Sequence, residues 1–157
     1  MYKPCFAFDR SPAEKHDMFK SWDRDDRAFF AAGACHILAN LFVQMHGHEG
    51  YKMVFIKPAE GFSGTHVYAS DGTWAFDHNG WTHEKELLRL TELAYTEKYP
   101  GWAYTRICID DSMSSLEEFC KKYTHRLPWQ FARLPWERAY AYIKQFPERP
   151  PTDVPLI

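Results

Sequence analysis

The sequence lacks several features that would place it outside ordinary globular proteins. No apolar run approaches the roughly 20 residues that a membrane-spanning helix needs. Basic charge is not in excess, because 19 lysine and arginine residues face 21 acidic ones, for a net charge of −2. That balance argues against a protein that covers nucleic-acid phosphates. Internal repeats and low-complexity tracts are also absent from the 157 residues, a length that suits one compact domain.

Signals for disulfides and for export are missing as well. The four cysteines form no CxxC pair and no dense disulfide spacing; they are Cys5, Cys35, Cys108 and Cys120. The first nine residues, MYKPCFAFD, have no long apolar segment of the kind that signal peptides carry. We therefore expect a cytoplasmic protein with free thiols that contacts neither a membrane nor nucleic acid.

Aromatic residues are abundant, at 17% of the chain, and favour a dense core. Apolar residues recur at helical spacing from Ile37 to Met45, which predicts a helix over 34–46 with Cys35 in its first turn. Gly33 is a plausible break before this helix, and Gly47 is placed as its C-terminal cap. A shorter helix is expected over 12–20.

Strands and further helices follow from alternation, turns and capping residues. We expect strands over 51–57, 65–70, 73–77 and 102–109. Helices are expected from Thr82 as N-cap to about 98, from a Ser114–Glu117 capping box to about 125, and from Pro135 to about 146. This order predicts an α+β fold, with a helix that carries the cysteine packed on a small, mainly antiparallel sheet, plus C-terminal helices.

The domain organisation follows from the same pattern. We expect a single domain over 1–157, with a core at about 26–110 and a C-terminal helical part at about 111–146. The remaining residues, 147–157, are proline-rich and are expected to form a loose tail.

The Asp71-Gly72 pair predicts a tight hairpin whose register can be worked out. If these two residues form the turn, opposed residues have numbers that sum to 143, and His66 lies opposite Asp77. Directly opposed side chains project from the same face with Cβ atoms about 4.5–5.5 Å apart. The carboxylate can therefore hydrogen-bond the imidazole and orient it, while Val67 and Phe76 face a core on the other side.

An oriented imidazole is half of a nucleophilic site, and Cys35 can supply the thiol. The free N–H groups and the dipole of a helix N-terminus stabilise a thiolate there. In this hypothesis Cys35 attacks an acyl carbon, His66 moves the proton, and Asp77 holds the imidazole tautomer. Backbone N–H groups near Cys35 would bind the oxyanion.

These segments resemble the transglutaminase-like branch of the papain-fold cysteine proteins. The similar pieces are Gly33-Ala34-Cys35 before the helix, Thr65–Tyr68 in one strand and Gly72–Asp77 in the next, about one third of the chain. The family's Asp is often followed by Pro, whereas His78 follows here. The resemblance implies a papain-like core and a thiol-dependent hydrolase or acyltransferase that acts on an amide or related acyl bond of a small molecule, peptide or protein.

Two other functions remain open from the sequence. The chain could be a non-catalytic binding module that keeps the papain-like scaffold. It could also be a metal-dependent hydrolase, because several histidines lie close together in the sequence: His36, His46, His48, His78 and His83. No CxxC or HExxH spacing occurs, so we expect no metal site and no cofactor. The sequence favours an enzyme and leaves its substrate, its acyl acceptor and its oligomeric state undefined.

Overall fold

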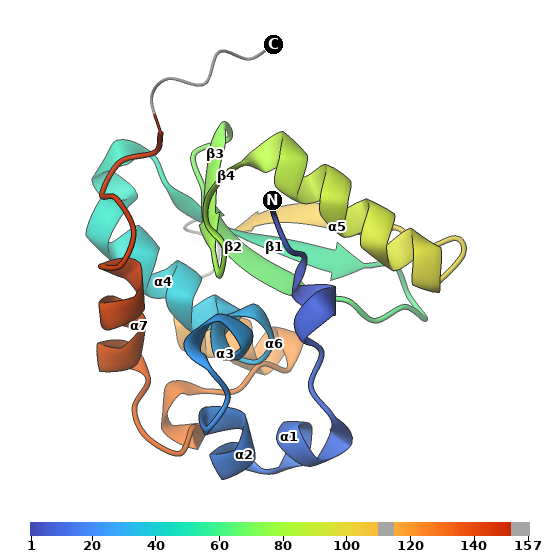
Figure 1. Cartoon of the computed structure of the whole chain (residues 1–157), viewed down its shortest axis with the longest axis horizontal. Coiled ribbons are helices and arrows are strands. Elements are labelled where there is room, and N and C mark those ends of the chain that lie inside the picture. The colour runs from blue at the N-terminus through green and yellow to red at the C-terminus, as the bar shows by residue number, and fades with distance from the viewer. Residues whose placement is uncertain (110–114, 152–157) are drawn as a thin grey trace.

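The fold is built on one five-stranded antiparallel sheet (Figure 1). The computed structural model describes residues 1–109 and 115–151. The strands lie in the order β4-β3-β2-β1-β5. Their bounds are β1 Lys52–Pro58, β2 His66–Ser70, β3 Trp74–Asp77, β4 Gly80–His83 and β5 Tyr104–Ile109.

Helices cover both faces of the sheet. Within the described ranges the α-helices are α1 Pro12–His16, α2 Met18–Trp22, α3 Asp26–Ala31, α4 Cys35–His46, α5 Glu84–Lys98, α6 Leu116–Tyr123 and α7 Trp136–Ile143. Short 3₁₀ turns are η1 Cys5–Phe8, η2 Gly47–Glu49 and η3 Pro128–Gln130. The predicted α+β class with an antiparallel sheet is confirmed. No helix in these ranges is both long and apolar enough to span a membrane.

Alternation along the strands assigns one core to each face. Val67 and Phe76 face α4, where Phe76 stacks on Phe42 with ring centroids 4.4 Å apart. Tyr68 and Ala75 point the other way, toward α5 and the N-terminal residues. Figure 1 shows α5 on one side of the sheet and α4, α6 and α7 on the other. The cysteine helix therefore packs on the sheet, as the sequence predicts.

The helix predicted over 34–46 is confirmed as α4, but the one predicted over 12–20 is wrong as a single element. Asp17 interrupts it with an extended backbone, and its carboxylate accepts hydrogen bonds from the N–H groups of Phe19 and Lys20. An aspartate that caps a new helix competes with continuation of the old one. The segment therefore forms two short helices, α1 and α2.

The sequence did not predict β4. Asn79 and Gly80 were expected to end the hairpin, and Thr82 to cap the following helix. Instead the chain reverses there, Gly80 adopts a φ of 76°, and Asp77 pairs with Gly80. Thr82 lies in β4, and α5 begins at Glu84. Glycine tolerates this left-handed conformation, so a tight turn could form where a stop was expected.

The predicted register of the β2–β3 hairpin is also wrong, by two residues. Ala69 pairs with Phe76 and Ser70 with Ala75, so the opposed numbers sum to 145. The Asp71 carboxylate accepts hydrogen bonds from the N–H groups of Thr73 and Trp74, which widens the turn. Because the shift is an even number of residues, no side chain changes face.

The C-terminal part departs from expectation at its first helix. Ser115, rather than Ser114, caps α6, with its hydroxyl accepting from the N–H of Glu118; Ser114 lies outside the described residues. The start of the expected tail is attached, because Trp81 Nε1 donates to the Pro147 carbonyl at 2.7 Å. Residues 152–157 of that tail lie outside the described residues, and the single-domain organisation stays a prediction.

Candidate active site

His66 and Asp77 meet as a buried hydrogen-bonded pair. His66 is the first residue of β2 and Asp77 the last residue of β3, and His66 Nε2 lies 2.9 Å from Asp77 Oδ2. The two side chains are 0% and 2% exposed. Continuing the observed register would put Asp77 opposite Tyr68, so that His66 and Asp77 are diagonal neighbours on one face. The predicted contact is present, although the register behind it was wrong.

Asp77 is held by donors on every side. Its Oδ2 also accepts from the Tyr2 hydroxyl at 2.6 Å, and its Oδ1 accepts from the Asn79 N–H at 2.8 Å. Burial alone raises the pKa of this carboxyl group, but the charge of His78 and the hydrogen bonds from His66 and Tyr2 lower it well below the ordinary range. Asp77 is therefore ionised and can only accept, which assigns the shared hydrogen to His66 Nε2.

The other ring nitrogen of His66 is available for proton transfer. Nδ1 is buried and, among the described residues, has no hydrogen-bond partner. With the hydrogen on Nε2, the neutral ring presents a lone pair at Nδ1. A buried polar atom without a partner is costly in a purely structural role. A neighbouring thiol would transfer its proton to this nitrogen.

Cys35 is the first residue of α4 and lies on the wall of a cavity of about 580 Å³. The chain enters the helix through Gly33, whose φ of 116° turns the backbone, and through Ala34 as N-cap. Only 7% of Cys35 is exposed. The thiol is thus almost enclosed by protein, yet it borders a space into which a substrate could enter.

The charges around Cys35 and His66 favour a thiolate beside an imidazolium. Burial raises the pKa of the Cys35 thiol, but polar contacts with His36 and His66 and their positive charge outweigh burial and lower it well below its ordinary value. Burial lowers the pKa of His66, whereas the charge of Cys5 and contacts with Asp77 and Cys35 raise it well above the usual range. The positive charge of His66 therefore favours the Cys35 thiolate, whereas the largest effect that raises the pKa of His66 comes from Cys5.

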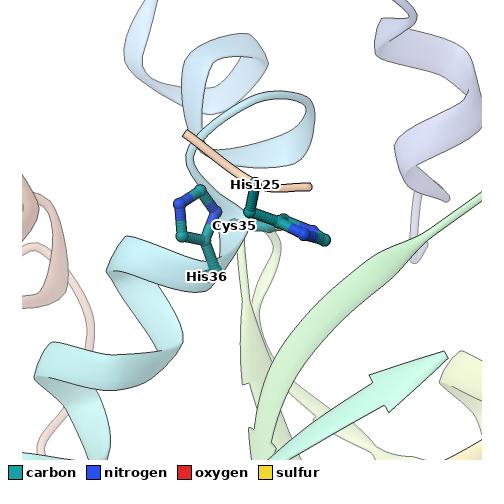
Figure 2. Close-up of side chains that lie close together, drawn as sticks. All are labelled: Cys35, His36 and His125. Atoms are coloured by element: carbon teal, nitrogen blue, oxygen red, sulfur yellow. The ribbon is translucent and has the colours of Figure 1, made fainter. Parts of the chain in front are cut away.

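Two further histidines flank Cys35 (Figure 2). One ligand atom from each of Cys35, His36 and His125 lies within 4.8 Å of the others. His36 follows Cys35 in α4, and His125 lies just after α6. Burial lowers the pKa of His36, but contacts with Cys120 and Cys35 raise it to about 9. Burial, and next the charge of His36, lower the pKa of His125.

One ring nitrogen of each of these two histidines contacts a backbone carbonyl. His36 Nε2 lies 2.7 Å from the Arg126 carbonyl oxygen, and His125 Nδ1 lies 3.0 Å from that of Tyr123. Carbonyls only accept, so each of these nitrogens carries the hydrogen. His36 Nδ1 is buried without a partner in the described part of the chain. When the rings are neutral, the lone pairs therefore lie on His36 Nδ1 and His125 Nε2, and a metal ion would displace the proton that the raised pKa keeps on His36 near neutral pH.

A second group of possible metal ligands is buried and not accessible from solvent. His66, Asp77 and His78 also offer atoms within 4.8 Å of one another, but none is more than 2% exposed. Tyr2 covers Asp77, and His78 Nε2 lies 2.7 Å from the Lys3 carbonyl oxygen. The other histidines considered from the sequence lie elsewhere: His46 and His48 lie next to Glu49, and His83 stacks on Trp74.

The sequence analysis missed several residues that shape the site. Tyr2 and Cys5 come from the N-terminal segment, more than 60 residues from β2, and Cys5 Sγ lies 3.4 Å from the Tyr95 hydroxyl. Arg10 and His125 also line the cavity. No local periodicity marks these four residues, since each arrives from a loop or short turn. In the MYKPCFAFD segment the sequence indicated only that there is no long apolar run of the kind that signal peptides carry.

In comparisons with known proteins, no family model matches the sequence, no curated protein is similar to it, and no solved structure resembles the fold.

Proposed function

We propose that this protein is a thiol-dependent hydrolase or acyltransferase with a Cys35–His66–Asp77 triad. The observation that carries the proposal is the buried His66–Asp77 pair, which leaves His66 Nδ1 without a partner near a cysteine at a helix N-terminus. Nδ1 of His36 and of His78 also lacks a hydrogen-bond partner in the described residues, and His66 is distinguished from them by its 2.9 Å hydrogen bond to the Asp77 carboxylate. The carboxylate sets the tautomer that makes Nδ1 the base.

The chemistry follows from these positions. The Cys35 thiolate attacks the carbonyl carbon of an amide, a C–S bond forms, and the carbonyl electrons move onto oxygen. The first N–H groups of α4, at Cys35 and His36, lack partners within the helix and can donate to this oxyanion. The His66 imidazolium gives its Nδ1 proton to the leaving nitrogen as the C–N bond breaks. Water or an amine then loses a proton to His66 and displaces the thiolate.

The fold supports the family resemblance that the sequence suggested. A helix that begins with the cysteine packs on an antiparallel sheet, and adjacent strands carry the histidine and the aspartate. These elements are among those that the papain-like, transglutaminase-like resemblance implies. It favours acyl transfer at an amide or related acyl bond, with water or an amine as acceptor.

Acyl-enzyme formation tests the proposal directly. The protein is treated with p-nitrophenyl acetate near pH 7, and acetylation of each cysteine is followed by peptide mass spectrometry. We expect acetyl transfer to Cys35 and none at that position in Cys35→Ser. His66→Gln keeps the thiol but should react at least ~100-fold more slowly, because the base is lost.

Cys108 is the matched control, since it is an exposed cysteine in the edge strand β5, which β1 separates from β2 and its His66. Its labelling should be the same in wild type and in His66→Gln. A folded wild-type protein in which Cys108 is acetylated and Cys35 is not would contradict the proposal and would leave the scaffold as a non-catalytic binding module.

A second candidate function is a metal centre at Cys35, His36 and His125. His36 Nε2 and His125 Nδ1 each contact a backbone carbonyl, and such a contact orients metal-bound imidazoles in proteins. One Cys and two His also match the ligand set of some catalytic zinc sites, which keep one position for water. The ligand atoms, within 4.8 Å of one another, would draw closer around an ion.

Elemental analysis separates the two candidates. Protein purified without a histidine tag is analysed for zinc and other transition metals, and Cys35 is alkylated with and without a chelator. About one equivalent of metal, lost in His125→Ala, together with alkylation that requires the chelator, supports the metal centre. Metal-free protein whose Cys35 is alkylated equally in both conditions supports the triad.

A further inference from the structure

The cavity beside Cys35 has a charge opposite to that of the whole chain. Four basic side chains line it, namely Arg10, Lys15, Lys98 and Arg126, against one carboxylate, Asp9. The complete sequence has a net charge of −2. Among the described residues, none of the four cations forms an ion pair with a carboxylate within 4.0 Å. Positive charge is therefore concentrated at this cavity, and the described residues supply no direct carboxylate partner for it.

Arg10 is held directly beside the entrance to α4. A Cβ atom built on Gly33 would lie 3.1 Å from Arg10 Nη1, so the guanidinium packs over the backbone two residues before Cys35. A Cβ atom here would press on the guanidinium, and the φ of 116° favours glycine at this position. The position brings a permanent positive charge to the point where the thiol and the cavity meet.

Arg126 brings a second guanidinium close to the first. Both guanidiniums line the same cavity, and the pKa of Arg10 is lowered first by burial and next by the positive charge of Arg126. Arg126 Nη2 donates to the Lys15 carbonyl at 3.2 Å, whereas Nη1 has no partner in the part of the chain that the structure describes. Two partly buried guanidiniums with spare donors are unfavourable unless an anion binds between them.

We propose that the substrate of this site carries an oxyanion group, a carboxylate or a phosphate, that binds Arg10 and Arg126 while its acyl carbon faces Cys35. The inference rests on the proposed function and adds its substrate class. Guanidinium groups bind both kinds of oxyanion through paired hydrogen bonds. Lys15 and Lys98 add long-range attraction at the cavity wall.

Two alkylating reagents of the same size test this inference. Iodoacetate and iodoacetamide both form a C–S bond with the Cys35 thiolate and release iodide, but only iodoacetate is anionic. Second-order rate constants at Cys35 are measured by mass spectrometry, and their ratio is divided by the ratio for 2-mercaptoethanol, a neutral thiol. We expect a preference for iodoacetate of about 10-fold at low salt, falling toward 1 at about 0.5 M salt.

Charge-matched variants assign the preference to residues. Arg10→Gln and Arg126→Gln should each lower the preference by about 3-fold. Arg133→Gln removes the same charge from an exposed position outside the cavity and should leave the ratio as in wild type. Salt dependence in the wild type provides the same information without any variant, so poor folding of an arginine variant does not remove the test.

The outcomes separate this inference from the proposed function. Reaction of Cys35 with iodoacetamide but no preference for iodoacetate overturns the inference and leaves the triad standing. Reaction with neither reagent overturns both. Where the preference is found, protection of Cys35 from iodoacetamide by inorganic phosphate and not by acetate assigns a phosphate-bearing substrate, and the reverse assigns a carboxylate-bearing one; protection by neither ion overturns the anion site.

Discussion

Replacing Asp77 by asparagine probes the site most sharply, because the two side chains have nearly the same shape. In the wild type, Asp77 Oδ2 accepts from both the Tyr2 hydroxyl and His66 Nε2, and Oδ1 accepts from the Asn79 N–H. An amide has only one accepting oxygen. Whichever way the asparagine is oriented, its NH₂ group faces a neighbour that previously donated a hydrogen bond.

Each orientation has a definite cost. If the amide oxygen takes the place of Oδ2, the NH₂ group opposes the partly buried Asn79 N–H, which costs about 1–3 kcal/mol of folding free energy. If the NH₂ group takes that place, it donates to His66 Nε2, and the ring hydrogen moves to Nδ1. The ring then has no lone pair for the Cys35 thiol and cannot act as its base.

The electrostatic effect has the same direction. A charge-assisted hydrogen bond is worth about 1.5–3 kcal/mol, and one pKa unit corresponds to about 1.4 kcal/mol. Without the carboxylate, the His66 imidazolium is less stable, and the pKa of Cys35 should rise by about 1–2 units. The thiolate fraction should then fall about 10- to 100-fold at pH values below the wild-type pKa of Cys35, where the fraction follows the pKa directly.

The assay is the rate of Cys35 alkylation by iodoacetamide between pH 5 and about 10, followed by mass spectrometry. We expect the Asp77→Asn profile to shift to higher pH, with Cys108 unchanged as the exposed reference thiol. Circular dichroism checks that the variant is folded. A folded Asp77→Asn protein with the wild-type Cys35 profile would refute the coupling between carboxylate, imidazole and thiol.

Three further results are expected. Tyr2→Phe removes the 2.6 Å hydrogen bond to buried Asp77, and urea unfolding should show a loss of about 1.5–3 kcal/mol; an unchanged midpoint would contradict this. Gly33→Ala should lower the thermal midpoint more than Gly72→Ala does. Both glycines have positive φ, but only a Cβ atom at position 33 would meet another side chain, at 3.1 Å from Arg10 Nη1; equal midpoints would count against that packing. Because folding lowers the pKa of Asp77, its ionised carboxylate contributes to the free energy of unfolding fully above about pH 4, and this contribution is lost as the pH falls. Wild type should therefore lose more stability in acid than Asp77→Asn does.

Local patterns in the sequence were enough for the elements that present the site. The apolar spacing of 34–46 predicted α4 and put Cys35 in its first turn. Alternation along 65–70 and 73–77 predicted that His66 and Asp77 share a face. The contact between His66 and Asp77 is present although the predicted register was wrong, because a shift of two residues leaves every side chain on the same face.

Where local signals conflicted, the prediction failed. Asn79-Gly80 is both a stop and a turn, and only pairing with β3 decided that β4 would follow. Asp17 and Asp71 bind nearby backbone N–H groups, which split one predicted helix and widened one predicted turn. Such side-chain contacts compete with regular structure by small free energies that composition does not reveal.

The sequence by itself determined the class of fold and the pairing of a histidine with an aspartate, because periods of 3.6 and 2 residues are properties of neighbouring positions. Only the tertiary structure decided what surrounds them. Tyr2 against Asp77, and Arg10 and Arg126 beside Cys35, come from distant segments without a repeating pattern. Their meeting depends on how helices and loops pack over the sheet, which is a long-range result of burying the two cores.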